Sequence, residues 1–187
     1  CLFLTTGVVD HETGTRDVTQ LGGLGKVMLP IALAAGLAAL SIAGIPFTWG
    51  FIGKDLVYDA LVHGEANVIT LTALAVITNI LLSYSGYLAG VYPFVGKLPE
   101  KLKDVHLPSA LMWLPPVLLA LCGILFGILP SLVDKSVIPG MATALGVASE
   151  LEPLKIWHGL NIVLLLSAVT IVGGVILYFI LKPSTGR

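Results

Sequence analysis

The side chain best placed to do chemistry in this sequence is a lysine, Lys54, with uncharged residues before it. Residues 44–53 carry no charge, and the chain becomes apolar again at Leu56 and Val57. An ammonium group at membrane depth is costly, so a lysine there can accept and release a proton. The alternative is a lysine at a helix end whose ammonium reaches the lipid headgroups. The depth of Lys54 decides between these hypotheses, and both stay open.

Other titratable side chains follow Lys54 along one helical face. Asp55, Asp59 and His63 recur every four residues, which aligns them in one stripe. The stripe indicates either a proton-accessible mouth on the outer side of a membrane or a solvated helix end. His158, next to Trp157, is a further candidate for proton relay because histidine titrates near neutral pH. A hydrogen-bonded histidine at the membrane interface is the alternative there.

A polar stripe inside a later apolar segment is the third candidate. Asn79 and Ser83 lie four residues apart, and such side chains can support a chain of water molecules. The same residue types also hold membrane helices together, so helix packing is the alternative. The sequence has no hydrolase, metalloprotease or nucleotide-binding motif, and Cys1 and Cys122 lie in apolar sequence without Cys or His neighbours. We therefore expect no enzyme activity in the chain itself, no metal and no cofactor.

The distribution of charge indicates the elements that must position these side chains. Hydrophobic residues make up 56% of the 187 residues and charged residues 11%, against about 25% charge in a typical soluble domain. Four windows contain no Asp, Glu, Lys or Arg: 27–53, 66–96, 107–133 and 156–181. Each exceeds the roughly 20 residues that cross a bilayer as a helix. This pattern, with a net charge of −1, argues against a secreted domain, a cytosolic enzyme and a nucleic-acid-binding protein.

We predict an all-α fold, a polytopic bundle of transmembrane helices with one helix broken by Pro and Gly. Lipid offers no partner for backbone groups, and the alternation of barrel strands is absent, so the spans are expected to be helical. The expected segments are the tail of a truncated transmembrane helix at 1–9, a loop at 10–26, a broken transmembrane helix at 27–62, transmembrane helices at 66–96, 107–133 and 156–181, and an outer-side link at 134–155.

The helix break is predicted at Gly44, Ile45 and Pro46. The continuous pattern around it runs for about 35 residues, or roughly 50 Å of helix, too long for one straight span. Pro46 lacks an amide hydrogen and its ring clashes with the carbonyl group of Ile42. Backbone groups freed by such a break are tolerated only against protein or a water-filled cavity, so breaks often mark ion pathways. An ordinary proline kink used for packing is the alternative.

The basic residues of the loops predict the orientation. With four spans, the loops at 10–26 and 97–106 and the C-terminus share one side of the membrane. That side carries seven Lys and Arg residues and the other side three. Because short cytoplasmic loops are enriched in Lys and Arg, we expect the first side to face the cytoplasm of a cell whose plasma membrane holds the protein.

Several stretches together resemble one family, the large subunits of Mrp-type Na+/H+ antiporters. They are residues 2–7 (LFLTTG), 10–17 (DHETGTRD), 21–24 (LGGL), 43–46 (AGIP), 50–55 (GFIGKD) and 154–161 (LKIWHGLN). The motif around Lys54 is similar throughout the superfamily of antiporter-like subunits, which includes proton-channel subunits of respiratory complex I and of membrane-bound hydrogenases. The TGTRD and WHG stretches favour the Mrp branch. One departure is Pro46 followed by Phe47, where the family usually has two consecutive prolines, so a shorter unwound segment is expected.

The resemblance implies a role for Lys54 as the lysine in the broken helix of the second half-channel, near its exit. It implies proton transfer along a row of Lys, His and Glu at the membrane midplane, with a helix break that lines a cavity. This chain then corresponds to the C-terminal part of the core. The implied partners are the other subunits of the antiporter complex, the lipid bilayer, and protons and Na+ as transported ions, with no nucleic acid.

Two other functions stay open from the sequence. The first is a proton-pumping subunit of a complex I (NADH dehydrogenase) or hydrogenase relative, in which redox chemistry takes place on partner subunits. The second is a non-conducting helical scaffold around a packing kink. A Lys54→Ala change that leaves transport intact would support the scaffold.

Overall fold

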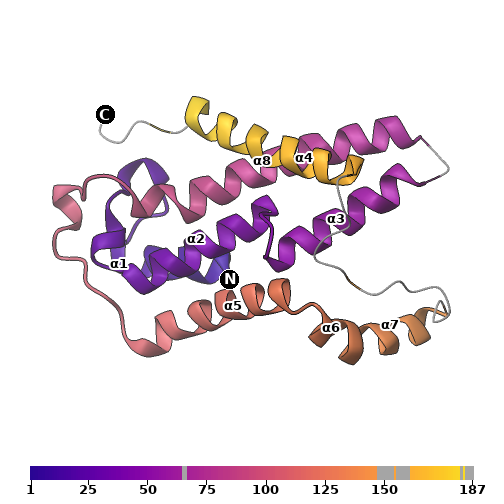
Figure 1. Ribbon diagram of the computed structural model, residues 1–187. Coiled ribbons are helices and arrows are strands. Elements are labelled where there is room, and N and C mark those ends of the chain that lie inside the picture. The colour runs from indigo at the N-terminus through magenta and orange to yellow at the C-terminus, as the bar shows by residue number, and fades with distance from the viewer. Residues whose placement is uncertain (65–66, 147–153, 155–160, 182, 184–187) are drawn as a thin grey trace.

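Helices make up the regular structure of the chain (Figure 1), which confirms the all-α, polytopic fold expected from the sequence. The computed structural model describes residues 1–64, 67–146, 154, 161–181 and 183. The α-helices within them are α1 (Leu2–Thr13), α2 (Leu29–Ala43), α3 (Trp49–Val62), α4 (Val68–Gly90), α5 (Ala110–Ile128), α6 (Ser131–Ser136), α7 (Ile138–Leu145) and α8 (Ile162–Leu181). Short 3₁₀ turns are η1 (Val18–Gln20), η2 (Leu24–Lys26), η3 (Tyr92–Phe94) and η4 (Glu100–Leu102).

Three segments among the described residues are long and apolar enough to cross a membrane. They are Val68–Phe94, Ala110–Ile128 and Ile162–Leu181. The shorter apolar helix α2 is followed by α3, and together they occupy the fourth long apolar segment of the sequence. The broken helix expected there is therefore present as two separate helices.

The α2–α3 pair runs through the middle of the bundle (Figure 1). α2 contacts α1, α4, α5 and α8, and α3 contacts α4, α5 and α8. α4 and α8 pack side by side, with α5 on the opposite side of α2–α3 (Figure 1). Both halves of the broken helix are thus bordered by α4, α5 and α8.

A glycine cap ends α2, and Pro46 lies beyond it. Gly44 adopts the left-handed conformation at φ 71° and ψ 46°. Its amide donates to the carbonyl of Ser41 at 3.0 Å, and the Ile45 amide donates to Leu40 at 3.1 Å. This pair of bonds is a Schellman motif, in which a glycine stops the helix and a proline commonly follows. Pro46 therefore lies beyond the end of α2, where it cannot continue the helix.

The second half-helix begins at Thr48, beside the first. The Thr48 hydroxyl accepts a hydrogen bond from the Phe51 amide and donates one to the Ile45 carbonyl. The Gly50 amide donates to the Ser41 hydroxyl at 3.2 Å. A Cβ atom on Gly50 would overlap the carbonyl oxygen of Ser41. Only glycine at position 50 lets the start of α3 lie this close to the end of α2.

A helix from outside the pair supports the break. A Cβ atom on Gly127 of α5 would overlap the carbonyl oxygen of Phe47 and the backbone of Thr48. One position earlier, Phe126 meets the ring of Trp49 edge-on, with ring centroids 6.1 Å apart. The linker between α2 and α3 is therefore packed directly against the end of α5.

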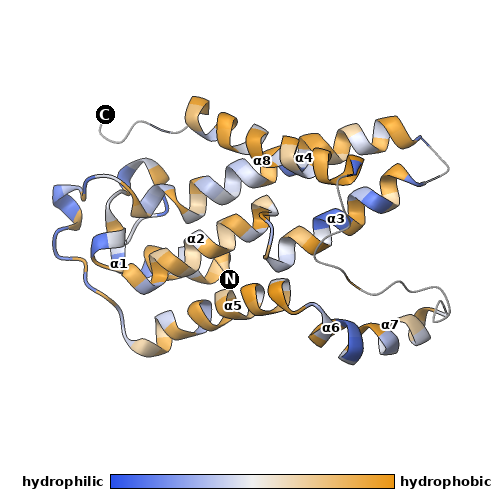
Figure 2. Cartoon of the chain, viewed as in Figure 1, coloured by the Kyte–Doolittle hydropathy of each residue, from blue (hydrophilic) through white to orange (hydrophobic). Residues whose placement is uncertain are grey.

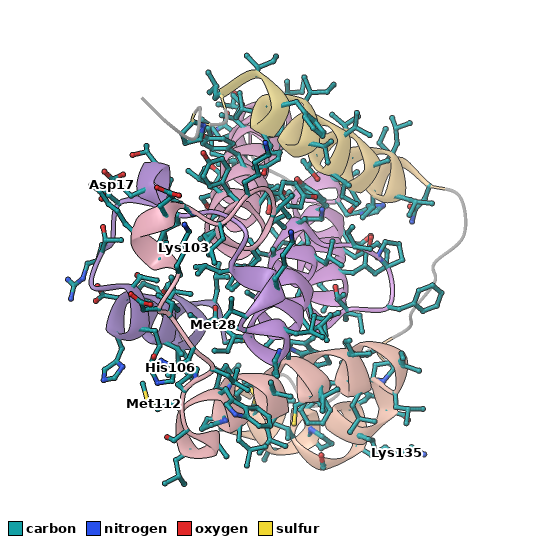
Figure 3. The ribbon with its side chains drawn as sticks, turned by 90° about the vertical axis from the view of Figure 1, so that its left-hand side faces the viewer. Asp17, Met28, Lys103, His106, Met112 and Lys135 are labelled. Carbon is teal, nitrogen blue, oxygen red and sulfur yellow. The ribbon has the colours of Figure 1, made fainter. Side chains whose placement is uncertain are left out.

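The loops at 10–26 and 97–106 lie together at one end of the bundle (Figure 2, hydrophilic residues at the left). α1 extends through Thr13, into the range expected to be loop, and Gly14 ends it at φ 66°. The Gly23 amide donates to the Val95 carbonyl at 3.0 Å. Under these loops lies an apolar cluster that includes Leu24, Met28 and Ile31, each fully buried. Figure 3 views this end and shows Met28 within the helices, with Asp17 and Lys103 among the loops.

Candidate proton-transfer site

Lys54 is buried where the two halves of the broken helix meet. Only 7% of the surface of Lys54 is exposed. The Nζ atom donates to the carbonyl oxygen of Ala43 at 2.7 Å and to the hydroxyl of Thr170 at 3.0 Å. A Cβ atom on Gly44 would lie 2.6 Å from Nζ, so the lysine passes directly over the glycine that ends α2. The structure places Lys54 inside the bundle, away from the exposed end of α3.

The end of α2 is an electrostatically favourable place for an ammonium group. The last carbonyls of a helix lack intrahelical partners and carry the negative end of its dipole. The carbonyl of Ala43, the last residue of α2, is one of them, and hydrogen bonds from a charged donor are the strong ones. The break therefore frees an acceptor, and Lys54 uses it.

The second partner of Lys54 comes from α8. The Thr170 side chain is fully buried, accepts from Lys54 and donates its own proton to the Ser167 carbonyl at 2.8 Å. This contact joins positions 54 and 170, which are 116 residues apart. Thr170 was not among the residues predicted from the sequence. The available signal was Ser167 and Thr170 three residues apart, on one face of an otherwise apolar span.

The predicted stripe on α3 is split between the interior and the surface. Asp55 is buried, at 8% exposure, directly beside Lys54 in the chain. Asp59 and His63 are exposed and paired, with His63 Nδ1 3.3 Å from the Asp59 carboxylate. The exposed pair lies at the end of α3, so Asp55 shares the depth of Lys54 and the other two do not. His158 lies outside the described residues.

Asn79 and Ser83 border the same region from α4. The Asn79 amide donates to the Ala75 carbonyl at 2.9 Å, and the Ser83 hydroxyl donates to the Asn79 carbonyl at 2.7 Å. Ser83 is fully buried, and a Cβ atom on Gly174 of α8 would overlap its Cβ atom. Both donors are used within α4, which fits helix packing, yet the Asn79 side chain also lies beside the Tyr58 hydroxyl of α3.

The chemistry that this arrangement supports is proton binding. Lys54 brings a titratable amine, Ala43 and Thr170 bring acceptors for its ammonium form, and Asp55 brings a neighbouring carboxylate. Within the part of the chain that the structure describes, no three His, Cys, Asp or Glu side chains are grouped to bind a metal ion.

Comparison with known proteins shows what the region around this site is similar to. A protein-family model described as "NADH:quinone oxidoreductase/Mrp antiporter, TM" matches residues 1–83, a range that includes the break and Lys54. An Na(+)/H(+) antiporter subunit of Staphylococcus haemolyticus is 37% identical over 172 residues, which cover 86% of this chain and 21% of that protein. Over most of its length the chain is similar to the Mrp-type antiporter subunits.

Two further comparisons extend the relation to this antiporter group over almost the whole chain. A probable K(+)/H(+) antiporter subunit of Rhizobium meliloti is 33% identical over 193 residues, 97% of this chain and 19% of that protein. The structure of the Mrp complex from Dietzia sp. DQ12-45-1b contains a chain that matches with a TM-score of 0.71 and 28% identity, over 99% of this chain and 21% of that chain. The chain spans about a fifth of the length of these relatives, and the resemblance noted from its sequence motifs is confirmed.

Proposed function

We propose that this chain is part of a membrane subunit of a multisubunit monovalent cation/proton antiporter and that Lys54 binds and releases the transported proton. The observation that carries the proposal is the buried Lys54 ammonium on the freed carbonyl of Ala43, in a chain related to antiporter subunits. A scaffold around a packing kink would need no ionisable group at that point, because burying a charge costs free energy.

Protonation changes how Lys54 is held. As an ammonium it is bound by the negative end of the α2 dipole and by Thr170. As a neutral amine it donates weaker hydrogen bonds and loses its attraction to that dipole and to the Asp55 carboxylate. The side chain is then free to turn to another partner, so one proton can both charge the site and fix the lysine against α2.

The transported cation, the partners and the orientation are part of the same proposal. The names of the two relatives contain Na(+)/H(+) and K(+)/H(+), and we propose Na+ exchange for this chain, with K+ as the competing ion. The other subunits of the complex, together with the rest of the large one, would complete the pathway within the lipid bilayer. The loops at 10–26 and 97–106, together at one end, are proposed to face the cytoplasm.

The test is cation-dependent proton antiport in everted membrane vesicles that contain the full-length, assembled complex. Wild type is compared with Lys54→Ala and with Lys101→Ala, a matched change at an exposed loop lysine. We expect Lys54→Ala to abolish antiport and Lys101→Ala to retain it, with equal assembly in all three.

Normal antiport in an assembled Lys54→Ala complex would instead support the scaffold. A wild-type complex that shows no antiport with Na+ or K+, but pumps protons when a reductant is added, would replace the proposal with the redox-driven alternative. That alternative remains within the family, because the description of the matching model names NADH:quinone oxidoreductase alongside the Mrp antiporter.

A further inference from the structure

Three buried hydroxyl groups among the described residues have no hydrogen-bond partner: those of Tyr58, Thr72 and Ser167. They lie on α3, α4 and α8, respectively. These three helices contact one another, and two of them, α3 and α8, carry Lys54 and its partner Thr170. The unpaired groups are therefore concentrated on the helices around the proposed proton-binding site.

The Tyr58 hydroxyl is the one nearest to the chemistry. Tyr58 is fully buried, and its hydroxyl lies beside the side chains of Thr170 and Asn79 without closing a hydrogen bond to either. Thr170 is also the residue that accepts from Lys54. The third member of the group, Ser167, is 1% exposed and three residues before Thr170, on the same face of α8.

Buried hydroxyl groups in proteins are almost always hydrogen-bonded. Where no protein atom forms the hydrogen bond, an ordered water molecule usually does. Tyr58 and Ser167 are enclosed by this chain alone, so their burial does not depend on other subunits. A water molecule needs two to four polar partners. The hydroxyls of Tyr58, Thr170 and Ser167 and the amide of Asn79 can supply them.

We propose that Tyr58, Thr170 and Ser167 hold buried water next to Lys54 and that the Tyr58 hydroxyl passes protons between this water and the outer end of α3. The inference rests on the proposed role of Lys54. Tyr58 lies four residues, about one helical turn, beyond Lys54 in the direction of Asp59 and His63. A third buried hydroxyl without a partner, that of Thr72, lies near the start of α4.

The proposed transfer conserves protons at every step. Nζ of Lys54 gives one proton to the water, keeps the electron pair and becomes a neutral amine. The water gives a different proton to the Tyr58 oxygen, as the proton already on that oxygen leaves to a second water on the outer side. Tyr58 is unchanged after each passage, and no charge remains on it.

The experiment compares Tyr58→Phe with Tyr87→Phe in the assembled, full-length complex. Both changes remove only the hydroxyl group of a buried tyrosine residue, but Tyr87 packs against Tyr178 and its hydroxyl is not among the buried unpaired groups. We expect Tyr58→Phe to lower antiport about tenfold or more, as for loss of a proton-transfer group. The solvent deuterium isotope effect on the rate should rise as proton transfer becomes limiting. Tyr87→Phe should leave both quantities unchanged.

A second pair of variants keeps the inference testable if Tyr58→Phe does not assemble. Thr170→Ser retains the hydroxyl and should retain antiport, whereas Thr170→Val keeps the shape, removes the hydroxyl and should lose it. A map of the wild-type complex that resolves ordered water should show density within hydrogen-bond distance of the Tyr58 hydroxyl.

The outcomes separate this inference from the proposed function. If Lys54→Ala abolishes antiport while Tyr58→Phe transports normally with an unchanged isotope effect, the tyrosine relay is wrong and Lys54 keeps its role. Absence of water density at Tyr58 would also overturn the inference. If Lys54→Ala itself transports normally, the proposed function fails, whatever Tyr58 does.

Discussion

The Nζ atom of Lys54 lies 2.7 Å from the carbonyl oxygen of Ala43, so a side chain of α3 forms a hydrogen bond with the last carbonyl group of α2. The charge and the break are therefore one structural unit. The break provides the free carbonyl that accepts from the ammonium, and the ammonium satisfies a carbonyl that lipid could not. Substitutions that move the end of α2 should consequently act on Lys54 even where they leave the lysine itself in place.

Replacement of Gly44 by alanine is the most direct example. Position 44 has φ 71°, which costs a residue with a Cβ atom about 1–2 kcal/mol. The new Cβ atom would also lie 2.6 Å from Nζ of Lys54. We expect Gly44→Ala to lower the stability of the assembled complex and to reduce antiport about tenfold or more, measured by thermal unfolding and in everted vesicles.

The matched control is Gly36→Ala, in the interior of the same helix. A Cβ atom there meets no atom within 4 Å. Because alanine favours helix over glycine by roughly 0.5–1 kcal/mol, Gly36→Ala should be neutral or slightly stabilising, with normal antiport. Equal behaviour of the two variants would show that the end of α2 does not constrain Lys54.

The crossing of the two half-helices predicts a second glycine effect. In Gly50→Ala the added Cβ atom would overlap the Ser41 carbonyl, so α3 must move away from α2. Overpacking of this kind costs about 1–3 kcal/mol. Gly53→Ala, in the same helix with no atom near its Cβ position, is the control. We expect a lower melting temperature for the first variant only, and a lower melting temperature for both would contradict this account.

The sequence was sufficient for the features that depend on local composition. Charge-free windows predicted the membrane-spanning helices, because lipid excludes charges over a fixed length. Gly44 and Pro46 predicted the break, although the structure shows that Gly44 ends the helix and Pro46 lies beyond it. The helix thus ends before Pro46, at a position where the Pro46 ring would clash with a carbonyl only if the helix continued.

The partners of Lys54 could not be predicted in the same way. Ala43 has no side-chain signal, since its carbonyl matters only because α2 ends there. Thr170 reaches the site through the packing of α8 against α3, which no local pattern specifies. The polar residues Asn79 and Ser83 of α4 led to the prediction of a polar path, whereas no prediction was made for Ser167 and Thr170 of α8.

The linker between the half-helices holds a non-glycine residue in the left-handed region. Phe47 has φ 70°, a conformation that costs such a residue about 1–2 kcal/mol. We compare Phe47→Gly with Phe47→Ala, since both remove the ring and only glycine removes the backbone cost. The glycine variant should be more stable than the alanine variant by about 1 kcal/mol. Chemical or thermal unfolding of the complex measures the difference, and a more stable alanine variant would refute it.

The proposed orientation predicts which positions react with a membrane-impermeant thiol reagent. Lys101 lies at the loop end of the bundle and Leu145 at the end of α7, and both are exposed. In a cysteine-free background, Lys101→Cys should be labelled in everted vesicles and Leu145→Cys in right-side-out cells. The reverse pattern would place the loops at 10–26 and 97–106 outside the cytoplasm.

The loop end of the bundle should respond to acid through Asp17. Its carboxylate accepts from the Thr19 hydroxyl at 2.7 Å, from the Gln20 amide at 2.9 Å and from the Thr19 backbone amide at 2.9 Å. These bonds favour the charged form and hold the pKa of Asp17 below its ordinary value of 3.8. Because the folded-state pKa is the lower one, the stabilisation is present above the ordinary value and is lost as the pH falls through the folded-state pKa.

Hydrogen exchange at the amides of η1 measures this loss. Protection, corrected for the intrinsic effect of pH on exchange, should hold from neutral pH down to the ordinary pKa of an aspartate and decrease below it. Asp17→Asn keeps an acceptor at the start of η1 but cannot titrate, so its protection should not change with pH. Equal acid-induced loss in wild type and Asp17→Asn would assign the effect to another group. The position of Asp17 in a surface loop makes the test independent of the transport site.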